Sequence, residues 1–418
     1  MNRKKILVFS DCYIYGGSER LISFLIKNEI IKAHFEVYFS YRAHSSYNIG
    51  MKDDYRNVSK QLIFPLMLLS NETLFFKINC LQLPFLVKAV MKLPFYILQK
   101  FQIYTLWNAV ILFLLLKKVK PDIVHVNNGG YPAAKNCNLL VWINKIFHEA
   151  TVIYQVNNQA QKRKAVWDVF FDRKIVSYVD KFITASFLAK NSLITNRKFD
   201  SEKIVVFNNC VEPSTVKRSR AEVLKDLQLS KSKFLIVQVA FLTKRKGQAY
   251  LIEAIDQLVK ERKDIEDTIQ VLLIGDGEDE KKLKDIVTTK GLEKIFSFLG
   301  YRTDSPDYIS ACNIFVLPSI SHEDMPLVIL TALQLGKPII ASDFAGIAQA
   351  IQSGENGILV NCETKNLSRN LAESIKRLYD DPDFCTKLSN AAKDSFQNYT
   401  PEKYGRSLVK LYQEVEND

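Results

Sequence analysis

Residues 314–338, IFVLPSISHEDMPLVILTALQLGKP, join an apolar run, a polar loop and a second apolar run. The first run predicts a strand that ends at Pro318, and the residues after Pro326 predict a helix. The loop between them presents Glu323. Because amides in the first helical turn lack intrahelical partners, those near residues 327 and 328 could hold a phosphate beside this carboxylate. A carboxylate here also stabilises a helix start by itself, so an ordinary cap is the alternative.

The same alternation of strand and helix extends along the chain. Short apolar runs followed by turn residues and helical periods predict buried parallel strands. The runs lie at 5–10, 122–127, 151–156, 181–186, 203–208, 234–240, 269–275, 297–301, 314–318, 338–342 and 357–360. Because the alternation occurs in both halves, we predict an α/β protein with two Rossmann-like, doubly wound parallel sheets.

A polar and basic stretch at 196–220 separates the two sets of strands, and 418 residues exceed what one core usually supports. We predict an N-terminal domain at 1–195, a C-terminal domain at 196–398 and a terminal helix at 399–418 that could pack on the N-terminal domain. Ligands of such sheets bind at the carboxyl ends of the strands, so the two domains are expected to face a cleft.

Two glycine-containing turns follow predicted strands. Gly16 and Gly17 precede a helix, where the backbone can approach an anion, although a tight turn without a ligand is the better explanation of this motif alone. Lys244, Arg245 and Lys246 stand together after the strand at 234–240, and three cations there predict a diphosphate clamp. A solvated loop is the alternative.

The composition, with 47% hydrophobic and 24% charged residues, is that of a folded chain and excludes disordered or fibrous classes. Seven scattered cysteines without a C-x-x-C pair indicate reduced thiols in a reducing compartment. The first apolar run is too short for a signal-peptide core, so we expect a cytoplasmic location.

Positive charge is concentrated in the first half of the chain. Residues 1–200 carry 28 Lys and Arg against 13 Asp and Glu, whereas residues 201–418 carry 29 against 32. Between 57 and 121, eight lysines stand among apolar and aromatic residues with a single acid, Glu72. This pattern favours an anionic membrane surface over nucleic acid, because no nucleic-acid module accompanies it. A pair of core helices with outward-reaching lysines is the alternative.

Ten different short motifs follow one another along the whole chain. They are Gly16-Gly17-x-Glu19, Pro121 to His125, Asp180 to Ser186, Asn209 to Glu212, Lys246-Gly247, Gly275 to Gly277, Leu299-Gly300, Pro318-Ser319, Glu323-x-x-Pro326 and Gly336 to Pro338. Each is weak alone, but the ordered set is specific. It resembles the family 4 glycosyltransferases of the GT-B fold, a retaining group that depends on nucleotide-sugars.

The resemblance implies transfer of a sugar from a nucleoside diphosphate with retention of configuration, with no metal and no other cofactor. By the matched positions, Lys246 would bind the leaving diphosphate, Glu323 the transferred sugar, and His125 the sugar or the reacting centre. Glu323 and His125 are therefore the predicted catalytic residues. The predicted donor-binding residues are Gly16, Gly17, Lys244, Arg245, Lys246, Asp324, Met325, Pro326, Leu327, Val328 and Thr331.

Three positions depart from the family pattern. Phe241 replaces the usual arginine, Thr331 replaces the second glutamate of the E-x7-E motif, and Gln349 replaces a glutamate. Each of the first two changes removes a charged hydrogen bond, at a cost of about 1–3 kcal/mol. The alternative hypothesis is therefore a non-catalytic paralogue that acts as a binding or partner-stabilising subunit.

The main hypothesis is a glycosyltransferase that extends a lipid-linked saccharide in capsule, O-antigen or exopolysaccharide synthesis. Its expected partners are a UDP- or GDP-sugar, a lipid-linked saccharide acceptor and a peripheral anionic membrane surface, with no nucleic acid. Its expected location is the inner face of the cell membrane.

Overall fold

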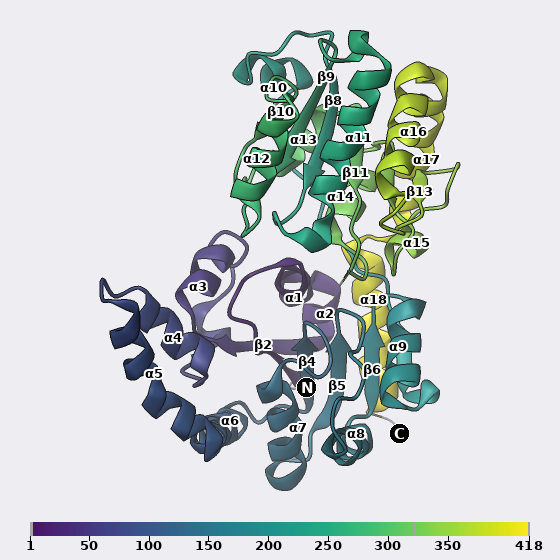
Figure 1. Cartoon of the computed structure of the whole chain (residues 1–418). Coiled ribbons are helices and arrows are strands. Elements are labelled where there is room, and N and C mark those ends of the chain that lie inside the picture. The colour runs from purple at the N-terminus through teal and green to yellow at the C-terminus, as the bar shows by residue number, and fades with distance from the viewer. Residues whose placement is uncertain (1–2, 322, 417–418) are drawn as a thin grey trace. The chain divides into compact units, whose positions relative to one another are not determined.

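The computed structural model describes residues 3–321 and 323–416. The chain forms two compact units, each a parallel sheet covered by helices (Figure 1). The first unit consists of Met1–Phe207 and Pro401–Asp418, and the second of Asn208–Thr400.

The first unit contains a seven-stranded parallel sheet in the order β3-β2-β1-β4-β5-β6-β7. Its strands are β1 (Lys4–Ser10), β2 (Phe35–Arg42), β3 (Ile63–Leu66), β4 (Ile123–Asn128), β5 (Thr151–Val156), β6 (Lys181–Thr184) and β7 (Ile204–Val206). Its helices are α1 (Gly17–Lys27), α2 (Glu29–His34), α3 (Ser45–Met51), α4 (Asn71–Asn79), α5 (Phe85–Lys100), α6 (Ile103–Val119), α7 (Lys135–Phe147), α8 (Trp167–Tyr178), α9 (Phe187–Arg197) and α18 (Pro401–Val415).

Both faces of this sheet are buried, because successive side chains of a strand point to opposite faces. Val124 and Val126 of β4 pack in one cluster with α6 and α7. His125, between them, faces α18 instead, where it contacts Tyr412. The apolar runs that predicted strands therefore form a core with helices on both sides.

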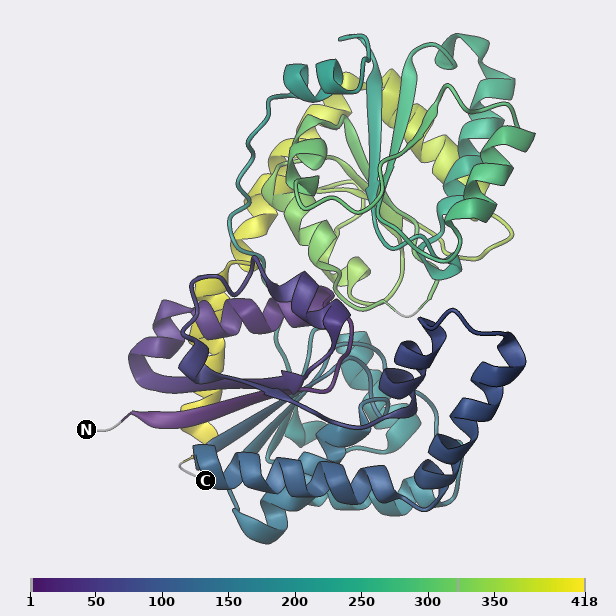
Figure 2. The same ribbon diagram turned by 90° about the vertical axis from the view of Figure 1, so that its left-hand side faces the viewer.

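Helix α18, the last of the chain, packs on the first unit (Figure 2). The side-chain amide of Asn28 donates to the carbonyl of Pro401 at 2.8 Å. A Cβ atom at Gly405 would lie 2.5 Å from Asn28 Oδ1, so this close approach requires glycine. Tyr412 meets Phe35 edge to face, with ring centroids 5.5 Å apart.

The second unit contains a six-stranded parallel sheet in the order β10-β9-β8-β11-β12-β13. Its strands are β8 (Phe234–Val239), β9 (Ile269–Ile274), β10 (Phe296–Phe298), β11 (Ile314–Leu317), β12 (Ile339–Ser342) and β13 (Ile358–Val360). Its helices are α10 (Arg220–Asp226), α11 (Gln248–Glu261), α12 (Glu280–Thr289), α13 (Ser305–Ala311), α14 (Leu327–Gln334), α15 (Ile347–Ala350), α16 (Leu367–Asp380) and α17 (Pro382–Ser395).

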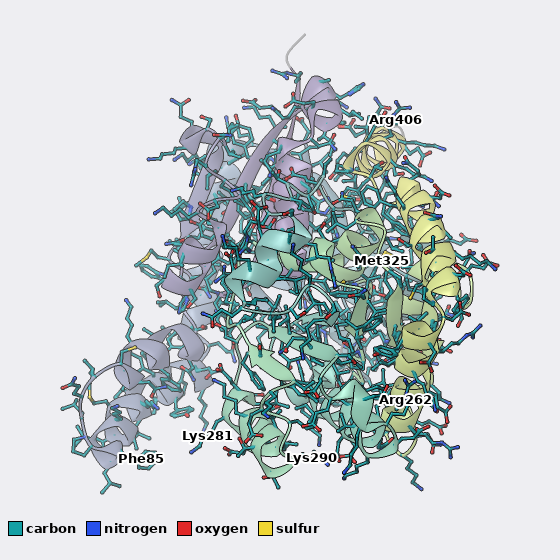
Figure 3. The ribbon with its side chains drawn as sticks, turned by 90° about the horizontal axis from the view of Figure 1, so that it is seen from above. Phe85, Arg262, Lys281, Lys290, Met325 and Arg406 are labelled. Carbon is teal, nitrogen blue, oxygen red and sulfur yellow. The ribbon has the colours of Figure 1, made fainter. Side chains whose placement is uncertain are left out.

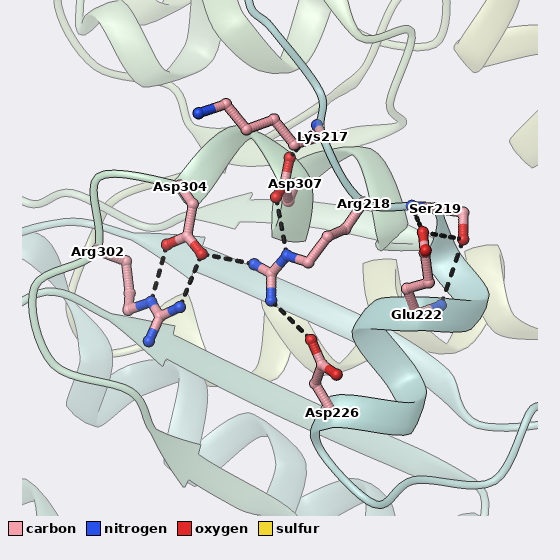
Figure 4. A network of polar contacts seen from close by, with 8 residues as sticks. All are labelled: Lys217, Arg218, Ser219, Glu222, Asp226, Arg302, Asp304 and Asp307. Carbon is pink, nitrogen blue, oxygen red and sulfur yellow. Dashed lines mark hydrogen bonds and ion pairs between the residues drawn. The ribbon is translucent and has the colours of Figure 1, made fainter.

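An ion-pair network fixes the segment that enters α10 (Figure 4). The guanidinium of Arg218 pairs with Asp226, Asp304 and Asp307 at 3.0, 2.6 and 2.9 Å. Ser219 and Glu222 then form a capping box at the start of α10. This basic stretch, which the sequence marked only as a boundary, is thus tied to α13.

The predicted fold class, two doubly wound parallel sheets, is confirmed. The strands β2 and β3 were not predicted, although FEVYFSYR at 35–42 is rich in aromatic residues. The predicted strand at 203–208 appears as β7 and pairs with β6, so the first unit ends after Phe207 instead of after residue 195.

Helices α4, α5 and α6 form an arm at one edge of the first sheet. All residues of α5, which lies within the described ranges, are at least partly exposed, and Phe85 stands at its outer end (Figure 3). The alternative of a core helix is therefore wrong for α5, whereas α6 buries Leu112, Leu115 and Leu116. In the described ranges no single helix is long and apolar enough to cross a bilayer. Helices α5 and α6 together are, but they are bent by 66° at their junction.

Candidate active site

Loops from two neighbouring strands of the second unit meet where the order of the sheet reverses. In the sheet, β8 lies between β9 and β11. The chain continues from β8 to β9 on one side and from β11 to β12 on the other, so the two connections leave in opposite directions. Ligands of doubly wound sheets bind outside the carboxyl ends of strands at such a switch point. The loop after β8 carries the turn Lys244–Lys246, and the loop after β11 carries Glu323.

Lys246 and Glu323 form an ion pair at this place. The ammonium of Lys246 contacts the Oε2 atom of Glu323, and both side chains are about nine-tenths buried. The hydroxyl of Ser319 donates to the same carboxylate oxygen at 3.2 Å. The structure thus brings together the two residues that the sequence predicted for the diphosphate and the sugar.

The backbone holds the two loops against each other. Gly247 has a φ of +74°, and a Cβ atom there would lie 1.9 Å from the carbonyl oxygen of Pro318. The amide of Ile320 donates to the carbonyl of Arg245 at 2.8 Å. The side chain of Gln238, on β8, donates to the carbonyl of Lys246 at 2.9 Å. Only glycine permits this approach, because any side chain would overlap the end of β11.

Helix α14 begins directly after this loop. Pro326 precedes it and has no side chain that could bond the first-turn amides of Leu327 and Val328. An α-helix leaves such amides without intrahelical partners, and its dipole favours an anion beside them. Met325 is buried, and its carbonyl accepts from the side-chain amide of Asn209 at 2.8 Å. The start of α14 therefore has no side-chain cap where the sequence predicts a phosphate, and the phosphate position stays a prediction.

The remaining predicted donor residues of this unit differ in their burial and contacts. Lys244 is exposed and Arg245 half-buried in the turn that carries Lys246. Asp324 is buried, next to Gly346. The hydroxyl of Thr331 donates to the carbonyl of Leu327 at 3.1 Å, inside its own helix.

The three departures from the family pattern have different environments. Phe241 is 42% exposed and stands in the loop after β8. The hydroxyl of Thr331 donates to a backbone carbonyl, and the side chain of Gln349 donates to the side chain of Asn208 at 2.6 Å. The same loop also contains the cations Lys244 and Arg245.

His125 does not have the surroundings of a catalytic residue. It is 1% exposed, with Nδ1 2.7 Å from the hydroxyl of Tyr412 and Nε2 3.0 Å from Oε1 of Gln155. Burial lowers the pKa of His125 to about 4, so the ring is neutral at pH 7. Since both ring nitrogens are engaged by protein groups, we correct the sequence prediction and assign His125 a structural role.

Gly16 and Gly17 lie at the switch point of the first sheet, between β1 and β4. Gly16 precedes α1, and a Cβ atom there would meet no described atom within 4 Å. Gly17 is the first residue of α1. The turn thus leaves space at the start of α1, as the anion prediction requires.

Glu19, the carboxyl group of the Gly16-Gly17-x-Glu19 motif, is buried at the same switch point, and the sequence predicted no role for it. Glu19 accepts from the hydroxyl of Tyr47 at 2.6 Å and from the side-chain amide of Asn127 at 3.2 Å. Burial raises the pKa of Glu19 despite these bonds. The polar partners come from β4 and α3, which the spacing of the motif could not show.

A hollow of about 580 Å³ lies elsewhere on the second unit, around the network of Figure 4. Arg218 and Arg302, which line it, are paired with Asp304. Because their charges are neutralised within the protein, we do not assign this hollow as the site. Within residues 3–321 and 323–416, no three His, Cys, Asp or Glu side chains are grouped to hold a metal ion.

Family comparisons agree with this geometry. Residues 83–215 match the family described as glycosyltransferase family 4, and residues 219–395 match glycosyl transferases group 1. The second match contains both Lys246 and Glu323. The chain belongs to the family 4 glycosyltransferases. Its two sheets are those of the GT-B fold.

Solved structures with this fold include other glycosyltransferases. HepE of Anabaena in complex with UDP superposes on this family 4 member with a TM-score of 0.74, covering 98% of this chain and 100% of HepE at 17% identity. A glycosyltransferase from Rickettsia africae gives a TM-score of 0.75 over 100% of both chains, also at 17% identity.

Curated relatives match over part of the family 4 chain. The UDP-Gal:alpha-D-GlcNAc-diphosphoundecaprenol alpha-1,3-galactosyltransferase of Escherichia coli is 31% identical over 269 residues, which are 60% of this chain and 66% of the relative. The lipopolysaccharide core biosynthesis glycosyltransferase LpsD of Rhizobium meliloti is 32% identical over 43% of this chain. The match spans about half of LpsD and of a kanosaminyltransferase from Streptomyces kanamyceticus.

Proposed function

We propose that the chain transfers a sugar from a nucleoside diphosphate to a saccharide acceptor. The observation that carries the proposal is the buried contact between Lys246 and Glu323 at the switch point of the second sheet. A donor with a diphosphate and a sugar presents an anion and hydroxyl groups side by side. An ammonium and a carboxylate in contact match those two features.

In this proposal each group has one task. The ammonium of Lys246 and the first-turn amides of α14 stabilise the diphosphate as the bond from its oxygen to the anomeric carbon breaks. Glu323 accepts hydrogen bonds from the sugar and orients it. The acceptor oxygen forms the new bond to the anomeric carbon, and its proton passes to the leaving diphosphate. Retention of configuration and independence of metal belong to the proposal and come from the family resemblance.

The names of the relatives support a choice of substrates. HepE has been crystallised with UDP-glucose, and the name of the Escherichia coli relative contains UDP-Gal and a diphosphoundecaprenol-linked sugar. A Campylobacter jejuni relative is also named for a diphospho-undecaprenol-linked acceptor. We therefore propose a UDP-sugar ahead of a GDP-sugar as donor, and a lipid-linked saccharide in surface-polysaccharide synthesis as acceptor.

The alternative, a non-catalytic GT-B paralogue, is favoured by Phe241 and by Thr331, whose hydroxyl is bonded to Leu327. The two hypotheses differ in nucleotide binding, because the enzyme must bind a nucleotide and the non-catalytic paralogue need not. A nucleotide at 100 times its dissociation constant should raise the free energy of unfolding by about 2.7 kcal/mol. Thermal denaturation with UDP, GDP and their sugars measures this effect. The absence of a shift with every nucleotide at millimolar concentration would favour the alternative.

We further propose that the protein lies peripherally on the cytoplasmic face of the membrane through α5 and α6. The apolar side chains of α5 point outward, with Phe85 81% and Val90 70% exposed. On α5, Lys88 donates to the carbonyl of Asn79, and Lys92 lies over the ring of Phe75. Cations beside exposed apolar side chains are typical of a helix lying in the interface of an anionic leaflet.

A triple variant tests this proposal. Replacing Lys88, Lys92 and Lys100 with glutamate should weaken flotation with vesicles of phosphatidylglycerol and phosphatidylcholine, because about 1 kcal/mol of attraction is lost per lysine near the surface. The matched control changes Lys281, Lys282 and Lys294 of the second unit to glutamate, which alters the net charge equally. Equal flotation of both triple variants and the wild type would contradict a role for α5.

A further inference from the structure

Exposed aromatic residues gather at the start of α8, outside the basic stretch that the sequence had marked. Val166, Trp167, Phe170 and Phe171 are 87%, 73%, 48% and 51% exposed. Four large apolar side chains within six positions of one helix start, all near or above half exposure, form a patch of a kind that marks an interaction surface. We call them the α8 patch.

The fully exposed charges that accompany the α8 patch are positive. The segment 161–174 contains two carboxylates, Asp168 and Asp172. Asp172 is buried, whereas the side chain of Asp168 is 27% exposed and hydrogen-bonded. Asp172 is 1% exposed and pairs with Arg163 at 2.8 Å and with Arg197 at 2.7 Å.

Asp168, in the first turn of α8, binds the backbone that leads into the helix. It accepts from the amides of Lys164 and Ala165 at 2.8 and 3.3 Å, and these bonds lower the pKa of Asp168. The exposed ionic groups of the segment are Lys162, Lys164 and Arg173. The α8 patch is therefore apolar with three exposed cations, while Asp172 is buried and Asp168 is held by backbone amides.

The α8 patch is continuous with the exposed side of α6 through α7. Trp142 of α7 packs against Phe170, Phe171 and Tyr178 of α8, with ring centroids 6.5, 6.4 and 5.5 Å apart. Phe147, at the other end of α7, meets Phe113 of α6 at 5.1 Å. Helices α6, α7 and α8 thus lie side by side on one face of the sheet (Figure 1).

The outward side of α6 and α7, next to the α8 patch, is also apolar. The exposed large apolar residues of α6 and α7 are Ile103, Leu106, Trp107, Val110, Leu114, Ile146 and Phe147.

We infer that the α8 patch is a second membrane-contacting element, which inserts its aromatic side chains into the same anionic leaflet as α6. This inference rests on the proposed membrane association and extends it to a helix far from α5 in the sequence. Lysine is depleted at protein–protein interfaces, whereas lysine beside tryptophan and phenylalanine is favoured at the headgroup boundary of anionic bilayers. The chemistry of the patch therefore fits a lipid surface better than a protein partner.

The three tryptophans of the chain allow a direct test. Trp107 lies on α6 and Trp167 in the α8 patch, while Trp142 is half-buried between α7 and α8. Three variants, each retaining one tryptophan and carrying phenylalanine at the other two positions, are bound to phosphatidylglycerol vesicles with brominated acyl chains. Quenching relative to unbrominated vesicles reports which ring reaches the acyl region, and circular dichroism checks that each variant is folded.

We expect emission from the Trp167 variant to fall at least about twofold, and emission from the Trp142 variant to fall less. Quenching of Trp107 without quenching of Trp167 would overturn the inference and leave the proposed membrane association standing. If neither Trp107 nor Trp167 is quenched and the protein does not float with vesicles, both fail.

Charge reversal provides a second readout. Glutamate at Lys162, Lys164 and Arg173 should weaken binding to phosphatidylglycerol vesicles on the order of 100-fold at low salt. The control is again glutamate at Lys281, Lys282 and Lys294, far from the α8 patch in sequence. Wild-type affinity in the first triple variant would overturn the inference.

Discussion

Replacing Lys246 with methionine should lower the rate of sugar transfer by about 100-fold or more, because the leaving diphosphate loses its charged hydrogen-bond donor. The same change leaves Glu323 as a buried carboxylate without its cation. Removing one partner of a buried ion pair destabilises a protein by about 3–5 kcal/mol. Loss of activity in this variant alone therefore does not separate chemistry from folding.

The double variant K246M/E323Q makes that separation. Glutamine carries no charge, so most of the lost free energy of unfolding should be recovered, while the rate of transfer stays about 100-fold or more below that of wild type. Steady-state transfer from a labelled nucleotide-sugar and urea denaturation measure the two quantities. Methionine at the exposed Lys282, on α12, is the matched control and should behave as wild type. Wild-type transfer by the folded double variant would refute the assignment of the site.

Lowering the pH from 7 to 4 should remove about 3 kcal/mol of stability from the first unit through His125 alone. The pKa of His125 is about 4 in the folded protein and about 6.5 when the ring is in water. Between these values the unfolded chain binds the proton and the folded chain does not. The contribution is therefore complete above pH 6.5 and is lost as the pH falls toward 4.

Glutamine at His125 can still form hydrogen bonds with Tyr412 and Gln155, but it does not titrate. Denaturant unfolding at pH 7, 5 and 4 should show a shallower loss of stability in this variant than in wild type. The comparison cancels other groups, such as Glu19, whose raised pKa makes stability fall as the pH rises. Equal slopes would contradict the structural role. A folded His125→Gln variant without transfer at pH 7 would restore the catalytic one.

The fold could be predicted because parallel strands buried on both faces are continuous apolar runs. Strand β2 escaped prediction because α2 leads into it without a turn residue: His34 ends the helix and Phe35 begins the strand. Strand β3 has only four residues and includes Pro65. Strand β7 was recognised, but its sheet was not, because pairing with β6 is a tertiary property.

The contact between Lys246 and Glu323 was predictable, since each follows a strand and the carboxyl ends of neighbouring parallel strands lie at one edge. The surroundings of His125 were not predictable, because its partner Tyr412 lies 287 residues away in the sequence. The α8 patch escaped notice for a similar reason. In the sequence Asp168 and Asp172 give that segment charges of both signs, and only the structure shows that Asp172 is buried and that Asp168 binds backbone amides.

A crystal structure with bound UDP or a UDP-sugar would locate the donor on the second unit. We expect diphosphate oxygens within hydrogen-bonding distance of Lys246 Nζ and of the amides of Leu327 or Val328, with the sugar beside Glu323. A nucleotide bound elsewhere, while Lys246 and Glu323 remain closed on each other, would contradict this expectation.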